Sequence, residues 1–358
     1  MSRQRPMARD DFGPTLLYVD ITNACPIGCA FCMYLPVQGK QHLLLDSRRT
    51  ATLKRLLETV SRLSISGEGE PLTQMARVLE VAALAGPSQV VEVITSAGIP
   101  WKMLERFLGD LEALALARGF TPRLRVSLDR WHAEKVPHHN HLPLIQRALV
   151  HQGQPGTTQV AFRSVTTERA WVTSTLGAQL AATGLHHAWS PVHELTAQLL
   201  VGSLHIPVTF KNLVHPEQTG TADPLPLEEY LHAIERVTGR PFTFGNLESP
   251  RRFAGPDVTV KHNGQVLLYG LEQERTWSLD EPGLDRGRIL DALLADPMLR
   301  ALYSIPLLEI VGHWRRVPAL SRCLDSVNNP YWVLKVMREK HGEAFHRVMQ
   351  DFLVMEAA

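Results

Sequence analysis

The stretch Cys25-Pro-Ile-Gly-Cys29-Ala-Phe-Cys32 holds three of the four cysteines of the chain, spaced C-x3-C-x2-C. It follows an apolar run over residues 16–21 that predicts a buried strand. Pro26 and Gly28 between the cysteines indicate a loop. Three thiolates on a tight loop can hold three irons of a [4Fe–4S] cube and leave the fourth iron without a protein ligand. The spacing therefore indicates a cluster with one open coordination position.

Two simpler interpretations of the cysteines stay open. A structural zinc site needs four ligands. The fourth ligand would have to be His42 or the distant Cys323, and neither belongs to a second ligand pair. Free cysteines also pack in protein cores as inert thiols, although a loop that contains proline and glycine is an unusual place for them.

With an aromatic residue, Phe31, before its last cysteine, the stretch resembles the signature loop of radical S-adenosylmethionine (radical SAM) enzymes. The resemblance implies that Cys25, Cys29 and Cys32 bind a [4Fe–4S] cluster whose open iron chelates S-adenosyl-L-methionine (SAM), and that Phe31 contacts the bound SAM. It also implies that reductive cleavage of SAM gives a 5′-deoxyadenosyl radical, which abstracts hydrogen from the substrate. An electron donor such as flavodoxin or ferredoxin would be a partner.

A second motif, Gly67-Glu68-Gly69-Glu70-Pro71, follows a short predicted strand. Glycines permit a close backbone approach, and a carboxylate accepts hydrogen bonds from an ammonium group. The segment resembles the Gly-Gly-Glu-Pro motif of radical SAM enzymes, which implies that Gly67, Glu68, Gly69 and Glu70 bind the amino group of SAM. The simpler alternative is an exposed acidic turn.

Further candidates lie at the carboxyl ends of predicted strands over 90–94, 124–129 and 159–165, the edge at which barrel enzymes place their sites. By the same resemblance, the residues expected to contact SAM or substrate are Thr95, Ser96, Ser127, Asp129 and Arg163. The catalytic residue is not defined by the sequence. Weak candidates are His132 and Glu134, for proton transfer, and Cys323, for hydrogen-atom transfer.

Helices expected over 46–63, 73–85 and 101–117 alternate with the strands, which predicts a parallel α/β sheet. Such units resemble the partial (β/α)6 barrel of TIM type found in radical SAM cores. A sixth strand is expected over 206–210, where its proline suits an edge position.

We expect a flexible lead-in over 1–14, the barrel over 15–215, a linker with a bridging helix over 216–245, and a smaller α+β domain over 246–358. The lead-in leaves no room for a peptide-capturing domain. The last region has a hairpin signal at Asn263-Gly264 and helical patterns over 287–303 and 330–355. It resembles the SPASM or twitch extension of some radical SAM enzymes, without the cysteines for an auxiliary cluster. The absence of that electron sink favours a redox-neutral elimination, rearrangement or epimerisation.

The composition of the chain limits the classes of partner and substrate that we expect. A net charge of +1 argues against nucleic acid as the main partner, and no apolar run approaches the ~20 residues of a membrane span. The polar first residues and clustered cysteines favour a reducing cytoplasm. The expected substrate is a small polar metabolite, sugar- or nucleoside-like, in natural-product biosynthesis. The alternatives are a ribosomally made peptide, activation of a glycyl-radical partner, rRNA modification and, from another class, a zinc-stabilised binding module without catalysis.

Overall fold

The computed structural model describes residues 12, 15–29, 32, 34, 37–212, 225–245, 256–271 and 275–357. The predicted SAM contact of Phe31, nearly all of the lead-in, and residues 216–224 of the predicted linker lie outside the described residues. Their predictions therefore stay predictions.

The barrel region is built on parallel strands, each of which pairs with the next parallel strand along the chain. The parallel strands are β1 (Thr15–Asp20), β2 (Val60–Ser66), β3 (Val90–Thr95), β4 (Thr121–Ser127), β5 (Gln159–Val165) and β8 (Leu204–Lys211). The carboxyl ends of all these strands therefore lie at one edge. This arrangement confirms the predicted α/β class with a partial barrel.

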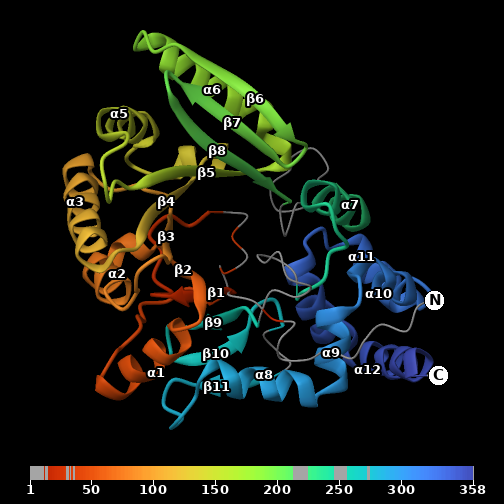
Figure 1. Cartoon of the computed structure of the whole chain (residues 1–358). Coiled ribbons are helices and arrows are strands. Elements are labelled where there is room, and N and C mark those ends of the chain that lie inside the picture. Colours follow the sequence, from red (N-terminus) through yellow and green to blue (C-terminus); the bar gives the residue numbers. More distant parts are fainter. Residues whose placement is uncertain are drawn as a thin grey trace.

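Helices between the strands cover the outer side of the curved sheet, as Figure 1 shows for α1, α2, α3 and α5. The elements of this layer are α1 (Ser47–Leu57), η3 (Pro71–Gln74), α2 (Met75–Ala82), α3 (Trp101–Arg118), α4 (Arg130–Lys135), α5 (His141–His151), η4 (Thr166–Glu168) and α6 (Arg169–Ala182). The strands supply fully buried apolar residues such as Leu17, Val91 and Leu124 to the core between the two layers.

The first predicted helix is shorter than expected. Asp46 begins it as predicted, because its side chain accepts a hydrogen bond from the backbone N–H of Arg49 at 2.8 Å. The helix ends at Leu57, however, and β2 already begins at Val60. The β-branched Val60 pairs with Thr15 of β1, so sheet pairing outweighs the helical spacing that had placed this residue in the helix.

The predicted edge position of the sixth strand is wrong. β8 lies between β5 and an antiparallel strand, β7 (Thr196–Val201), which in turn pairs with β6 (His187–His193). The parallel register with β5 begins at Val208, so Pro207 lies just before that ladder and does not interrupt it. The edge is β6, in a hairpin that the sequence analysis missed.

The C-terminal region adds its strands to the same sheet. The predicted hairpin at Asn263-Gly264 is confirmed by β9 (Val258–Val260) and β10 (Gln265–Leu268), and Gly264 has a positive φ of 87°. β9 pairs in parallel with the free side of β1, and β11 (Thr276–Ser278) pairs with β10. The described strands form one eleven-stranded sheet in the order β11-β10-β9-β1-β2-β3-β4-β5-β8-β7-β6.

Helices of the C-terminal part of the chain lie on the right of the view in Figure 1, except α8 (Arg286–Ala295), which lies at the bottom beside β11. The helices on the right are α7 (Leu227–Thr238), α9 (Pro297–Ser304), α10 (Leu307–Trp314), α11 (Pro318–Asp325) and α12 (Pro330–Ala357). The helix expected over 287–303 is two helices, because Pro297 starts a new one that Asp296 caps. α12 carries a non-helical backbone at His341.

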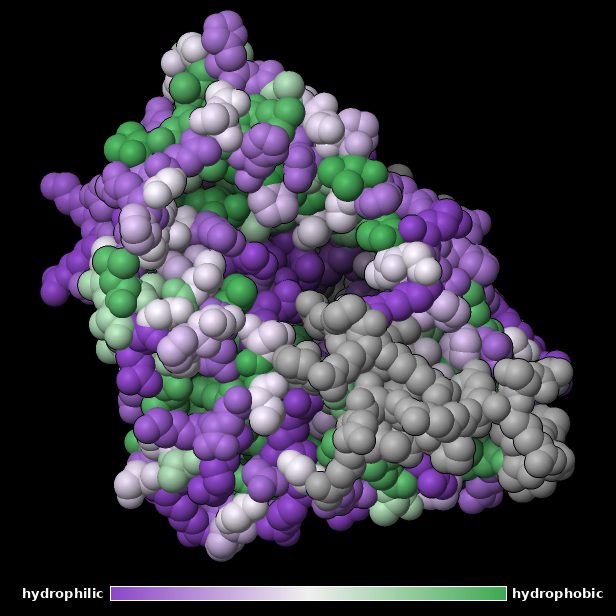
Figure 2. Space-filling view, viewed as in Figure 1, coloured by the Kyte–Doolittle hydropathy of each residue, from purple (hydrophilic) through white to green (hydrophobic). Residues whose placement is uncertain are grey.

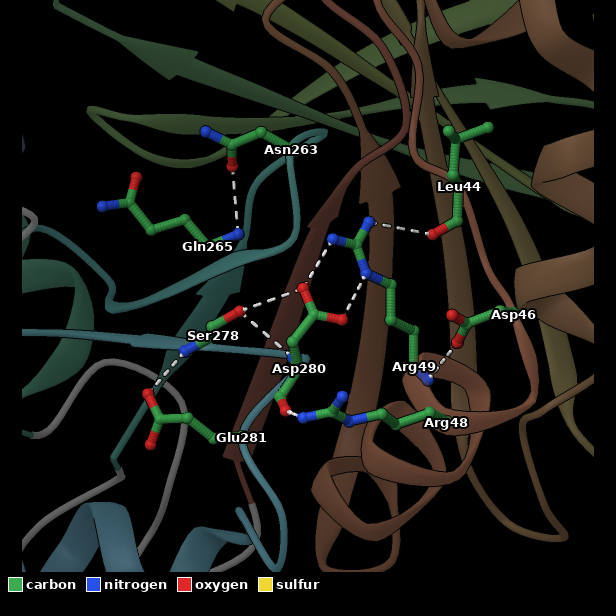
Figure 3. A network of polar contacts seen from close by, with 9 residues as sticks. All are labelled: Leu44, Asp46, Arg48, Arg49, Asn263, Gln265, Ser278, Asp280 and Glu281. Carbon is green, nitrogen blue, oxygen red and sulfur yellow. Dashed lines mark hydrogen bonds and ion pairs between the residues drawn. The ribbon is translucent and has the colours of Figure 1, made fainter.

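A polar network joins the first helix to this C-terminal region. Arg49 of α1 donates from Nε and Nη2 to the two carboxylate oxygens of Asp280, at 2.9 and 2.6 Å (Figure 3). Arg48 donates to the backbone carbonyl of the same aspartate, and Ser278 donates to its side chain. The bidentate pair holds the turn after β11 against α1.

None of the described helices combines the length and the apolar run that a membrane crossing requires.

Candidate active site

A cavity of about 500 Å³ opens at the carboxyl ends of the parallel strands. Its wall includes side chains from β1 to β5 and β8 on one side and from α7 and α12 on the other. Figure 2 shows a hollow with hydrophilic residues near the middle of the same view. Barrel enzymes carry their chemistry at this end of the strands.

The cysteine loop forms part of this wall. Cys25, Cys29 and Cys32 all line the cavity, and all are free thiols. The Cys25 sulfur accepts hydrogen bonds from the backbone N–H groups of Ile27 and Gly28, while the Cys32 sulfur accepts from the side chain of Gln38 at 3.7 Å. Burial raises the pKa of the Cys25 and Cys32 thiols.

The donor set fits an iron–sulfur cluster. Cysteine thiolates are the ligands that such clusters take, and N–H donors directed at the sulfurs are among the features that tune them. In the described part of the chain, no three His, Cys, Asp or Glu side chains are grouped so that they could hold one metal ion. In a cube, each cysteine binds a different iron atom.

The glycine motif packs directly against the segment that leads into the cysteine loop. Gly69 donates its N–H to the carbonyl of Thr22 at 2.9 Å, and Glu70 donates its N–H to the carbonyl of Ala24 at the same distance. A Cβ at Gly69 would lie 2.1 Å from the carbonyl oxygen of Ala24, and one at Gly67 would lie 2.5 Å from that of Thr22. The close approach that these glycines permit is thus to the chain's own backbone.

Glu70 is buried and its carboxylate is fully engaged. One oxygen accepts from the N–H of Leu72 at 3.1 Å and the hydroxyl of Thr95 at 2.5 Å. The other oxygen accepts from the N–H and the hydroxyl of Ser96, at 2.9 and 2.7 Å. Glu70 therefore joins the motif to the end of β3 and fixes both as one wall.

Glu68 is paired with the C-terminal hairpin. Its carboxylate lies 3.0 Å from Lys261 Nζ and 3.3 Å from His262 Nδ1. Lys261 also lies 3.3 Å from the carboxylate of Asp20, at the end of β1. The exposed fractions of the Lys261, Glu68 and Asp20 side chains are 8%, 11% and 1%, so this is a buried charge cluster and not the exposed acidic turn of the simpler interpretation.

Asp129 begins α4 just beyond the end of β4. It accepts from the backbone N–H of His132 at 2.9 Å, and its second oxygen lies 2.7 Å from Nδ1 of the same ring. His132 also contacts the sulfur of Cys29. Burial disfavours the charged imidazolium, but Asp129 and the Cys29 sulfur outweigh it and raise the pKa of His132 to about 10.

The part of the strand wall formed by β4, β5 and β8 is basic. Arg125 forms an ion pair with the buried Glu92 at 3.1 Å. Arg163 donates from Nε to the hydroxyl of Thr209 at 3.1 Å. Lys211 also lines the cavity; burial, together with the charges of Arg163 and Arg125, lowers the pKa of Lys211 to about 8.

Most residues singled out from the sequence meet at this cavity. Its wall contains Cys25, Cys29, Cys32, Gly67, Glu68, Gly69, Glu70, Thr95, Ser96, Ser127, Asp129, His132 and Arg163. Two of the weak catalytic candidates do not contribute to it. Glu134 is exposed on α4, and Cys323 is buried in α11.

Sequence reasoning missed Arg125, Lys211 and Lys261 as parts of the site. The first two had a detectable signal. Arg125 lies in one predicted strand and Lys211 directly follows another, and the carboxyl ends of both strands lie at the edge of the sheet that carries the site. Lys261 gave no local signal, since its partner Glu68 lies 193 residues away in the chain.

No protein-family model and no curated protein matches the chain. Among solved structures, anSMEcpe with bound AdoMet and Cp18Cys peptide matches at 13% identity and TM-score 0.46, over 95% of this chain and 99% of that one. BtrN in complex with AdoMet and 2-DOIA matches at 18% and 0.26, over 42% and 70%. Streptococcus suis SuiB bound to precursor peptide SuiA matches at 11% and 0.38, over 90% and 71%. At these identities and TM-scores the matches carry no argument about function.

Proposed function

We propose that this chain is a radical SAM enzyme, in which Cys25, Cys29 and Cys32 hold a [4Fe–4S] cluster. The observation that carries the proposal is the meeting of the C-x3-C-x2-C loop and the Gly69-Glu70-Pro71 turn at one cavity. Backbone hydrogen bonds join the turn to Thr22 and Ala24, directly before the loop, and both motifs lie at the carboxyl ends of parallel strands. When bound, the cluster would supply the electron for reductive cleavage of SAM, which no side chain of the protein can supply.

The protein's own residues hold and shape the site in this proposal. Glu70 orients the turn beside the cysteines through its four hydrogen bonds, so it is a positioning residue. Ser127 and Asp129 present polar groups from the end of β4 toward the same space. Side chains of α7 and α12 form the other wall of the cavity, across from the strands.

The proposed substrate is a small polar metabolite. A cavity of about 500 Å³ falls within the roughly 300–1,000 Å³ usual for sites that enclose small ligands. Cys323, the one cysteine outside the loop, lies in α11 and does not line the cavity. The redox-neutral outcome, an elimination, rearrangement or epimerisation, is proposed on that ground, because a second cysteine-bound cluster has no ligands to use.

The test is incubation of anaerobically purified, chemically reduced protein with SAM. We expect 5′-deoxyadenosine to form with the wild-type chain and to fall to background with Cys29→Ala. Cys323→Ala is the matched control and should leave the yield unchanged, since Cys323 is remote from the loop. Equal yields from wild type and Cys29→Ala would refute the proposal.

A further inference from the structure

The inner side of the strands carries more positive than negative charge. Glu92 of β3 is a buried carboxylate, and it lies 3.1 Å from Arg125 and 3.9 Å from Arg123. The charges of Arg62 and Arg163 also act on it and help to lower the pKa of Glu92, against the effect of burial. Several guanidinium groups therefore gather around one carboxylate on the inner side of β3 and β4, while the other carboxylates of the cavity wall include Glu68, Glu70 and Asp129 at the strand ends.

Two of the cations that line the cavity have no carboxylate partner in the described part of the chain. Arg163 makes its hydrogen bond to a hydroxyl, that of Thr209, and this bond uses Nε alone. Lys211 has no ion pair with any described residue, although Asp129 and Cys32 lie near enough to oppose in part the lowering of its pKa. Half-buried cations that lack an ion-pair partner are unfavourable, and a bound anion relieves this. A fold that keeps two of them side by side in a cavity is suited to an anionic ligand.

The strand register places these two cations next to each other. Arg163 of β5 is opposite Thr209 of β8, and Lys211 follows Thr209 by two residues. Side chains alternate along a strand, so Thr209 and Lys211 point to the same side, and Lys211 is the diagonal neighbour of Arg163. Both positions lie toward the carboxyl ends of their strands, at the cavity.

The wall that faces these cations contains several apolar and aromatic residues. From α7, α12 and the segments beside them it includes Tyr230, Ile234, Phe242, Leu271, Trp332 and Leu334. Tyr230 is close enough to Arg163 for the arginine to oppose the rise that burial causes in the tyrosine's pKa. The cavity thus offers the cations of β5 and β8 on one side. On the other side it offers a mixed wall, in which these apolar and aromatic residues lie beside Lys335 and Arg338 of α12.

We propose that Arg163 and Lys211 form a subsite for an anionic group of the substrate, a carboxylate or a phosphate, while the rest of the substrate packs against the α7 and α12 wall. Guanidinium and ammonium groups bind both anions with charge-assisted hydrogen bonds. The assignment of the anion to the substrate rests on the proposed function. The anion site itself does not, because it uses none of the cysteines.

The experiment is calorimetric titration of the anaerobically purified full-length chain with sodium phosphate and, separately, sodium acetate, against sodium chloride at equal ionic strength. We expect saturable binding of at least one of the two anions. Lys211→Gln and Arg163→Gln should each weaken it about tenfold or more, the loss that one charge-assisted hydrogen bond represents. Lys211→Arg should bind nearly as well as wild type, and the exposed Lys102→Gln of α3 should be unchanged.

Each other outcome overturns a defined part of the proposal. If neither anion binds, or if the glutamine variants bind as well as wild type, the proposed anion site is refuted. Binding that disappears once SAM is present at saturation assigns the cations to the carboxylate of SAM and refutes the assignment to the substrate. Cys29→Ala should still bind the anion, so failure of the cluster hypothesis and failure of the anion site are separate results.

Discussion

Gly69 shows how a single residue joins the two motifs of the site. Its α-carbon faces the backbone of Ala24 so closely that a Cβ would lie 2.1 Å from a carbonyl oxygen and 2.5 Å from the carbonyl carbon. Backbone atoms cannot move aside as a flexible side chain would. The sequence indicated a close approach here, but the partner is the segment before Cys25 and not a ligand.

We therefore expect Gly69→Ala to destabilise the protein by about 1–3 kcal/mol, as overpacking does, and to lower its iron content after reconstitution. Gly109→Ala is the matched control. Gly109 lies in α3 with open space around its α-carbon, so the same substitution should be neutral or add up to about 1 kcal/mol of stability. Urea unfolding midpoints and iron analysis measure both. Similar midpoints for the two variants would show that the contact is absent.

The acidic residues of the second motif were predictable as a pair but not in their separate roles. Glu68 and Glu70 are two residues apart, and both line the cavity. Glu70 is saturated by N–H and hydroxyl donors at the end of β3, whereas Glu68 pairs with the β9–β10 hairpin. These differences come from contacts with distant segments, which local sequence patterns do not encode.

Among the elements, α3 and α5 are joined by a largely buried ion pair that makes stability depend on pH. Arg147 of α5 donates two hydrogen bonds to Glu112 of α3, at 2.8 and 2.6 Å, and the N–H of Thr158 adds a third at 2.9 Å. Burial alone would raise the pKa of Glu112, but the bonds from Arg147 and Thr158 lower it below its usual value.

A carboxyl whose pKa is lower in the folded state stabilises the fold above its unfolded-state pKa of about 4.3. We predict that Glu112→Gln costs about 1–3 kcal/mol at pH 7, and that the difference from wild type shrinks as the pH falls below about 4. The exposed Glu105→Gln of α3 should have no such effect. The measurement is the urea unfolding midpoint of each variant and of wild type from pH 7 to below pH 4. A loss of stability in Glu112→Gln that is the same at every pH would contradict a stabilising role of the ion pair.

The β9–β10 hairpin is held to the barrel by the charge cluster around Lys261. Lys261→Met removes the cation that Glu68 and Asp20 share, and an uncompensated buried charge costs about 3–5 kcal/mol. We expect a lower thermal midpoint, with partial recovery in the Lys261→Met/Glu68→Gln double variant because one of the two orphaned charges is gone. Lys54→Met, on the exposed side of α1, is the control. Additive effects of the two substitutions would show that the residues do not interact.

At the scale of the whole molecule, the parallel order of the strands followed from the alternation of apolar strands and helices, and the expected barrel is present. The sequence did not reveal that β9 would extend the sheet from β1, because that parallel pairing joins segments about 240 residues apart. It also missed α10 and α11, whose short apolar segments lack a long helical period. The cavity between strands and C-terminal helices depends on these long-range contacts, so its basic and apolar walls emerged only from the structure.

The central claim is that Cys25, Cys29 and Cys32 together hold a [4Fe–4S] cluster at the mouth of this barrel. Its most direct test is the iron and sulfide content of the anaerobically reconstituted chain, with the visible absorption spectrum, for wild type and for single alanine variants of these cysteines. We predict about four irons per wild-type chain with a broad charge-transfer band, and loss of both in each variant, with Cys323→Ala unchanged. A colourless wild-type protein that binds one zinc ion through the same cysteines would contradict the account.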